Sequence, residues 1–437
     1  MKRRAIVFIV LFLAAAAFWS FAASDNERSK KDELYKQVEL FSDTLAIIQS
    51  DYVENVEPKN LIYGALKGML SSLDPHSQFM DPDTYNELKV DTQGKFGGLG
   101  IEITVKDGLL TVITPIEDTP AWKAGIKSGD RIVKIDKELT RDMTLTDAVK
   151  RLRGKPGEAV LLTVLRESEN KVLEFNIVRD IIKIKDIKNA RILEGGIGYI
   201  RLIEFREETP KEIDAVLKKL TGEGMNALIL DLRNNPGGLL DTAVRVTERF
   251  IDKDKLIVST KGRKGSQNLE FKSHSSQPIT DMPMVVLINE GSASGSEIVA
   301  GALQDYKRAI ILGTKSFGKG SVQTVIPLMD GSALRLTTSK YFTPLGKVIH
   351  GKGVTPDIEV EAGKIELRKK EDMLEEKNQD IFEEIENKDK DKGKDKDKDK
   401  DKPKEPEGVL DYKSDNQLMR AVDALKAVKI YQQIANK

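Results

Sequence analysis

The spacing of hydrophobic residues changes twice along the chain, and the changes divide it into regions of different structure. In residues 24–90 apolar side chains recur at helical spacing, as in Leu34, Val38 and Phe41, and Asp74-Pro-His76 interrupts the pattern. We therefore predict a helical N-terminal region. Its apolar stripe suits the core of a small helical domain and equally a dimer interface, and the pattern does not decide between the two.

Short alternating runs replace the helical spacing in residues 91–181. Two strands are predicted on either side of a turn at Lys106-Asp-Gly108. One short helix is predicted over Leu145–Leu152, because Thr144 precedes it and Asp147 follows three residues later, which is the spacing of a capping box.

Residues 182–364 alternate apolar strands with amphipathic helices. The runs Ala227–Leu230 and Met284–Ile288 are apolar throughout, as expected for strands that are buried on both faces. This β/α order predicts a sheet that helices largely cover.

The last part of the chain combines a charged segment with a final helix. Lys388–Lys402 alternates Lys with Asp, so residues 365–407 are predicted to be a largely disordered spacer. An ion-binding repeat is a weaker interpretation, because a lysine follows each carboxylate. In residues 408–437 an apolar stripe that includes Leu418 and Leu425 predicts a helix, which docks on a partner subunit or on its own body.

The N-terminus predicts export. Lys2-Arg3-Arg4 precedes an apolar run that ends at Ala23, and small residues allow cleavage after Ala22. The run is almost long enough to span a bilayer, so an uncleaved anchor is the alternative and would be the one attachment to a membrane. Either way we place the body of the protein in the periplasm or on the outer face of the cytoplasmic membrane.

Composition removes several classes of function. The 437 residues are 32% charged, yet the formal net charge is zero, so nothing favours a nucleic acid as a partner. The absence of cysteine excludes disulfides, thiolate metal sites and a cysteine nucleophile. The three histidines lie away from the serine-rich turn described next.

The turn between strand 284–288 and the next helix is the leading candidate for chemistry. Ser294 has small neighbours, and the helix N-terminus supplies partial positive charge where an oxyanion would form. The N–H of Gly295 is a natural oxyanion donor, and Gly237 or Gly238 could supply a second one. A helix N-cap explains any single serine here equally well, and that is how we interpret Ser292 and Ser296.

A lysine can replace histidine as the base only when its amine is neutral, which burial against apolar groups favours. Lys319 follows the apolar strand at 309–312, and Gln323 could hold its amine without adding a charge. Taken alone, Lys319 would be interpreted as a surface lysine. Acyl transfer by these residues needs no metal ion and no organic cofactor.

Three features of residues 91–181 together resemble a PDZ domain: Gly97-Gly-Leu-Gly100 before a strand, the run Ala124–Asp130, and the helix Leu145–Leu152. PDZ domains bind a peptide as an added strand and hold its terminal carboxylate in a glycine-rich loop. The resemblance implies peptide contacts at four residues. They are Gly98, Leu99, Gly100 and Ile101.

With this domain, five further motifs resemble the carboxy-terminal processing peptidases, also called tail-specific proteases. The motifs are Leu73-Asp-Pro-His76, Asp231–Gly238, Asn289–Ser294, Phe317–Gln323 and Gly353–Asp357. The resemblance implies an α+β multidomain fold with an N-terminal helical region, a PDZ domain, a crotonase-like (ClpP-like) α/β protease core and a C-terminal helix.

The resemblance also assigns roles. It implies Ser294 as nucleophile, Lys319 as general base and Gln323 as its orienting residue, with Asp305 and Arg308 supporting the site. Arg153 matches an arginine that links the PDZ domain to the catalytic site. The implied partners are protein substrates with flexible C-terminal tails, a second copy in a homodimer, and a regulatory or adaptor protein. Gly295, where many relatives have alanine, and the Lys/Asp spacer depart from the pattern.

Two other functions compete. Gly313–Lys319 nearly matches a phosphate-binding loop, but Gly320 replaces the Ser or Thr that binds magnesium, and a strand rather than a helix is predicted to follow. A PDZ adaptor without catalytic activity is the second alternative, and the combination of Ser294, Lys319 and Gln323 argues against it.

Overall fold

The computed structural model of this chain describes residues 32–363 and 412–435, so the predicted export signal and the whole predicted spacer lie outside the described residues. The described residues form two compact units. The first comprises the residues up to Asp83 together with Thr324–Leu336, and the second comprises Thr84–Gln323 and the residues from Thr337 on.

The first unit is mainly helical, as predicted, but it contains strands. A helix spans residues 32–51, and α2 (Pro58–Ser71) begins with proline, which fits the first turn of a helix. The predicted break at Asp74 is a turn in which its carboxylate accepts hydrogen bonds from the amides of His76 and Ser77. Strand β1 (Gln78–Met80), which the helical spacing did not predict, then pairs antiparallel with the start of β18.

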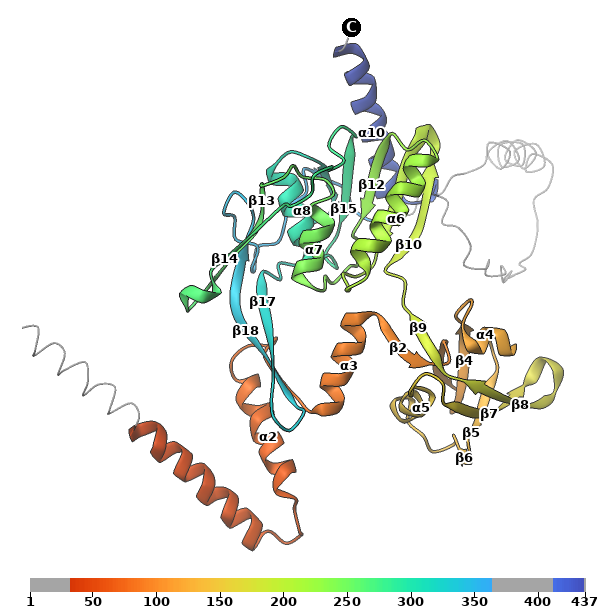
Figure 1. Ribbon diagram of the computed structural model, residues 1–437, viewed down its shortest axis with the longest axis vertical. Helices are drawn as coiled ribbons and strands as arrows, with labels where there is room; N and C mark the ends of the chain where they lie inside the picture. Colours follow the sequence, from red (N-terminus) through yellow and green to blue (C-terminus); the bar gives the residue numbers. More distant parts are fainter. Residues whose placement is uncertain (1–31, 364–411, 436–437) are drawn as a thin grey trace, which may run out of the picture. The chain divides into compact units, whose positions relative to one another are not determined.

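A domain of short strands opens the second unit after helix α3 (Pro82–Gln93) (Figure 1). Its main sheet has the order β3-β4-β5-β7-β8, with β6 beside β5. The predicted helix α5 (Leu145–Leu152) is confirmed together with its capping box between Thr144 and Asp147. The other elements are β2 (Lys95–Gly98), β3 (Ile101–Lys106), β4 (Leu109–Pro115), α4 (Pro120–Ala124), β5 (Arg131–Ile135), β6 (Glu138–Leu139), β7 (Ala159–Arg166), β8 (Lys171–Val178) and β9 (Asp180–Lys183).

The rest of the second unit is built on a sheet of order β10-β11-β12-β15-β16-β19, parallel from β11 to β19 with β10 antiparallel at the edge. The predicted alternation of strands and helices is therefore confirmed. The strands are β10 (Ile187–Leu193), β11 (Ile197–Leu202), β12 (Ala227–Asp231), β15 (Met284–Ile288), β16 (Ile310–Gly313) and β19 (Ile358–Glu359).

Helices cover both faces of this sheet, which explains the uniformly apolar strands. Leu228, Leu230 and Val286 face a core that contains α6 (Thr209–Gly222), α7 (Leu240–Thr247) and α8 (Gly295–Asp305) (Figure 1). The alternate strand residues, such as Ile229 and Val285, face α10 (Asn416–Ala435). Because successive strand residues point to opposite faces, every position had to be apolar.

The C-terminal helix docks on its own body. Leu418, Ala421, Val422 and Leu425 of α10 are buried against the sheet. Of the two alternatives that the sequence left open, docking on its own body is therefore the one observed for the first half of the helix. No helix in the described parts of the chain is both long enough and apolar enough to cross a membrane.

A second sheet has the order β1-β18-β13-β14, and β17 pairs with β18. Strands β13 (Leu256–Gly262) and β14 (Leu269–Lys272) were not predicted. Strand β17 (Ser321–Pro327) is the strand predicted to follow Gly320, and β18 (Ala333–Phe342) is one of the strands expected within residues 182–364. Along β17 and β18 the chain runs from the second unit into the first and back again.

Candidate active site

Ser294 occupies a sharp turn between β15 and α8. Its backbone angles are φ 53° and ψ −111°, outside the regions that residues other than glycine readily adopt. The turn is held by its neighbours, since Ser292 Oγ donates to the Leu232 carbonyl (2.7 Å) and Ser296 Oγ donates to the Asn235 carbonyl (2.9 Å). Ser292 and Ser296 are fully buried, as expected of structural serines, while Ser294 is only partly buried.

Glu297, which the sequence did not single out, connects the turn at residues 289–294 (the serine turn) with the loop at residues 314–320 that carries Lys319 (the lysine loop). Its Oε2 accepts hydrogen bonds from the amides of both Ser294 (2.9 Å) and Lys319 (2.8 Å). Its Oε1 accepts from Ser316 Oγ and from the Gly318 amide, both at 2.6 Å. One carboxylate oxygen thus brings together the backbones of two residues that are far apart in sequence.

Burial makes this carboxylate unusual. Glu297 is 0% exposed. Burial raises the pKa of Glu297, and the four hydrogen bonds oppose that rise. The signal in the sequence was the spacing Ser294-x-x-Glu297, which is typical of a helix N-terminus and does not reveal the second loop that the carboxylate binds.

Tyr341 adds a second link between the serine and the lysine loop. Its hydroxyl donates to the Lys319 carbonyl oxygen. Burial and the charge of Glu297 raise the pKa of Tyr341, while a hydrogen bond with the Ser294 side chain opposes the rise. The hydroxyl therefore lies beside both Ser294 and the backbone of Lys319, which is itself half-buried.

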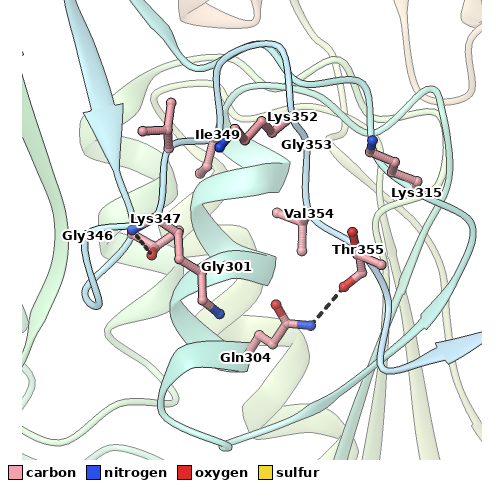
Figure 2. A pocket seen from close by; sticks show the side chains of 12 residues that line it. Gly301, Gln304, Lys315, Gly346, Lys347, Ile349, Lys352, Gly353, Val354 and Thr355 are labelled. Carbon is pink, nitrogen blue, oxygen red and sulfur yellow. Dashed lines mark hydrogen bonds between the residues drawn. The ribbon is translucent and has the colours of Figure 1, made fainter.

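The lysine loop is braced from behind by residues 349–354. The Val354 amide donates to Ser316 Oγ (2.7 Å), and the Gly351 amide donates to the Gly318 carbonyl (2.9 Å). Behind this brace lies a cleft of about 640 Å³, which Figure 2 shows between α8 and the loop that carries Val354. Neither Ser294 nor Lys319 lines it, so the cleft marks the rear of the loop rather than the reaction site.

Gln323 lies on β17, where its Nε2 donates to Ser321 Oγ at 2.9 Å. The expected contact between Gln323 and the Lys319 amine stays a prediction. The strand itself matters for one alternative function, because a phosphate-binding loop would lead into a helix, whereas this loop leads into β17.

The two glycines expected to help with an oxyanion have different surroundings. The Gly237 amide donates to Asn235 Oδ1 (2.9 Å), so its hydrogen is already used. The Phe205 amide donates to the Gly237 carbonyl, and the Phe205 carbonyl accepts from the Leu239 amide. In this parallel β-bridge the N–H of the intervening residue, Gly238, is directed away from Phe205. Gly238 is therefore the better candidate to join Gly295.

Gly237 still has a strict role in packing. Its φ is +102°, and a Cβ added there would lie 2.6 Å from the Ser294 Cβ and 2.7 Å from the Gly295 nitrogen. The loop after β12 thus passes directly against the serine turn because Gly237 has no side chain.

Asp305 is the last residue of α8, at the opposite end from Ser294, and Arg308 follows three residues later. The helix has 11 residues, which corresponds to a length of about 16 Å. Asp305 accepts from the Leu345 amide (2.9 Å) and pairs with Lys347 (2.7 Å), and Arg308 donates to the Ile279 carbonyl (2.6 Å). These contacts are with neighbouring loops, and the expected support of the active site by Asp305 and Arg308 stays a prediction.

The predicted peptide contacts of the PDZ-like domain meet in one groove of about 370 Å³ between β3 and α5. Arg153 lines the same groove, and its guanidinium lies 4.7 Å from the centre of the Phe96 ring. The residues that line it are Phe96, Gly98, Leu99, Gly100, Ile101, Glu102, Ile103, Ile113, Val149, Leu152 and Arg153.

Comparison with known protein families gives matches in three regions of the chain. Residues 196–360 match peptidase family S41, residues 111–166 match the PDZ domain, and residues 11–84 match the N-terminal domain of the activating protease CtpB. The three matches follow the order that the motifs predicted.

Individual relatives agree. The chain is 46% identical over 362 residues to a carboxy-terminal-processing protease of Bartonella bacilliformis, covering 82% of this chain and 83% of that protein. It is 36% identical to a probable CtpA-like serine protease of Staphylococcus haemolyticus, covering 80% and 69%. A solved photosystem II D1 C-terminal processing protease is similar with 30% identity and a TM-score of 0.43, covering 74% and 92%. The chain therefore belongs to the carboxy-terminal-processing proteases of peptidase family S41, and it is a serine protease that carries a PDZ domain.

Proposed function

We propose that the chain is an exported endopeptidase that cleaves proteins through an acyl-enzyme on Ser294, with Lys319 as the general base. The observation that supports this most directly is the Glu297 carboxylate, whose Oε2 binds the amides of both residues. A surface lysine and an ordinary helix cap would not share one buried acceptor.

The reaction follows from the order of proton transfers. The neutral amine of Lys319 takes the Ser294 hydroxyl proton as Oγ bonds to the substrate carbonyl carbon, and the amides of Gly295 and Gly238 stabilise the oxyanion. The carbon–nitrogen bond then breaks, and the leaving amine takes the proton from the lysine. Water attacks the ester in the same way and releases Ser294. Gln323 holds the lysine amine without adding charge.

The PDZ groove selects the substrate. A flexible C-terminal tail adds as a strand along β3, with its carboxylate at the amides of residues 98–101 and an apolar side chain against Val149 and Leu152. Arg153, in the groove wall, relays occupancy to the protease core. The enzyme works as a homodimer through its helical N-terminal region, and an adaptor or regulatory protein is a further partner.

Export rests on the sequence of the N-terminus, where three basic residues precede an apolar run. We place the protein in the periplasm or on the outer face of the cytoplasmic membrane.

The experiment that tests the mechanism compares Ser294→Ala and Lys319→Ala with Lys315→Ala, an exposed lysine on the same loop. With an unfolded substrate that ends in an apolar tail, we expect both site variants to lose at least about 10³-fold in kcat/KM and the control to remain near wild type. Wild-type activity should rise with pH, since only the neutral amine accepts a proton. Cleavage that persists in both site variants would refute the assignment.

A further inference from the structure

Arg233 connects the loop beside the serine turn with the C-terminal helix. It follows β12 by two residues and donates to both carboxylate oxygens of buried Asp231, Nε to Oδ1 (2.9 Å) and Nη2 to Oδ2 (2.6 Å). The same guanidinium contacts both oxygens of Asp415, with Nη1 to Oδ1 at 3.0 Å and Nη2 to Oδ2 at 2.8 Å. The side chain is 14% exposed, so the arginine is largely enclosed between two carboxylates.

Asp415 stands at the start of α10 and is fixed from its own side. Its Oδ1 also accepts from the Leu418 amide (3.1 Å), in the manner of a helix cap. Burial acts to raise its pKa, but the hydrogen bonds and charge of Arg233 hold the pKa of Asp415 below the usual value. Gln417 completes the contact, since it accepts from Arg233 Nη1 (3.0 Å) and donates to the Val360 carbonyl (2.7 Å).

From Arg233 the chain leads directly to the serine turn. The next residue, Asn234, exchanges hydrogen bonds with Asn289, its amide to Oδ1 (2.8 Å) and its Oδ1 from Nδ2 (2.9 Å). Asn235 then accepts from the Ala293 amide through its carbonyl (3.0 Å) and from the Gly237 amide through its side chain (2.9 Å). The loop from Arg233 to Gly238, called the oxyanion loop below, is therefore hydrogen-bonded to α10 at Arg233 and to the serine turn at Asn234 and Asn235.

We propose that the C-terminal helix is a working part of the active site, and that Asp415 is a positioning residue that fixes the oxyanion loop through Arg233. Oxyanion donors act only when they are placed to within a fraction of an ångström, and they gain that accuracy from the groups behind them. Without Asp415 the guanidinium keeps Asp231, which belongs to the same strand end, and on the side of α10 it keeps only the neutral side chain of Gln417. The charged link between the loop and the helix is then lost. The inference rests on the proposed function of Gly238 and Ser294.

The test uses the full-length protein and a short peptide substrate without a PDZ-binding tail. Asp415→Asn keeps the shape of the side chain but removes its charge, and Asp423→Asn, an exposed aspartate of the same helix, is the matched control. We expect Asp415→Asn to lower kcat at least about tenfold with KM within twofold, because only the transition state uses the oxyanion donors. Asp423→Asn should match wild type in both constants.

A third variant separates positioning from stability. Leu418→Ala weakens the packing of α10 without touching Arg233, so it should lower the melting temperature more than Asp415→Asn does and kcat less. The proposal is overturned if Asp415→Asn keeps kcat within twofold of the Asp423→Asn control. It is also overturned if the loss of kcat in Asp415→Asn and Leu418→Ala is proportional to their loss of melting temperature. A change in KM alone for Asp415→Asn would overturn it as well. Ser294→Ala, assayed alongside, decides the proposed function separately, since cleavage without Ser294 would refute that function whatever Asp415 does.

Discussion

The serine turn and the PDZ groove are both places where a polypeptide can bind, yet they are built in opposite ways. At the serine turn, hydrogen bonds with the loop after β12 and with the lysine loop fix the backbone, and the buried carboxylate of Glu297 accepts four hydrogen bonds. The groove is lined mostly by apolar side chains and glycine backbone, with Arg153 at its wall. The serine turn holds individual atoms in fixed positions, whereas the PDZ groove provides a surface for a bound peptide.

This difference follows from what each place has to do. Bond cleavage loses about 10²-fold in rate for a misplacement of 1 Å, whereas strand addition needs only a free backbone edge and a pocket for a side chain. A buried charge with part of its partners removed is worse than no charge at all. Damage to the serine turn should therefore be abrupt, and damage to the groove gradual.

The largest effect is expected from Glu297→Gln. The amide has one oxygen, so its NH₂ group must face donors that the carboxylate accepted, and the serine turn separates from the lysine loop. We expect kcat/KM to fall by about 10³-fold or more. Glu290→Gln, an exposed glutamate in the same turn, is the control and should stay near wild type. An active Glu297→Gln enzyme would show that the shared acceptor is dispensable.

Gly237→Ala should come next. The added Cβ would meet the Ser294 Cβ at 2.6 Å, and alanine at a φ of +102° is strained as well. We expect a loss of about 10²-fold in kcat. Gly224→Ala isolates the strain, because Gly224 has a φ of +90° with open space around it. If both variants retain full activity, close contact between the oxyanion loop and the serine turn is not needed for catalysis.

A change in the groove should be milder and selective. Val149→Glu places a carboxylate in the groove wall, where it repels the terminal carboxylate of a bound tail. Cleavage of proteins with apolar C-termini should fall about tenfold, which corresponds to roughly 1.4 kcal/mol, while a short peptide without a tail is cut as before. Val172→Glu, at an exposed position on β8, controls for the added charge. Equal losses for both substrates would mean that the groove serves the catalytic core and not recognition.

The smallest expected effect is on the melting temperature, and it depends on pH through the charge of Asp415. Because the folded protein lowers the pKa of Asp415, its stabilising contribution is present above the ordinary aspartate pKa and disappears as pH falls through the lowered value. Wild type should melt about 2–4 °C above Asp415→Asn between pH 5 and 8, and the gap should close below about pH 4. A gap that widens in acid would contradict this sign.

Local patterns predicted much of the fold. Uniformly apolar runs marked β12 and β15 and correctly indicated a sheet covered on both faces, and the capping box marked α5. Strand β1 was missed because three residues are too few to show a period. The last helix was predicted, but its docking site was not, since the partner of Asp415 lies 182 residues away.

The site could be predicted as a set of residues and not as a structure. Ser294 stood out by its small neighbours and Lys319 by the resemblance to a family. Glu297 was hidden, because its spacing from Ser294 already has an ordinary explanation as a capping box. Likewise, nothing in the order of residues 234–238 distinguishes Gly238, whose N–H is directed away from Phe205, from Gly237, whose N–H is bonded to Asn235.

Because φ is positive at Ser294, the residue that catalysis requires there is not the residue that gives the most stable fold. At φ 53° and ψ −111° a serine is disfavoured by about 1–3 kcal/mol, while glycine adopts such angles freely. An inactive chain with Ser294→Gly should consequently outlast the working enzyme on heating. Selection for peptidase activity therefore keeps serine at position 294, whereas selection for thermal stability alone would favour glycine.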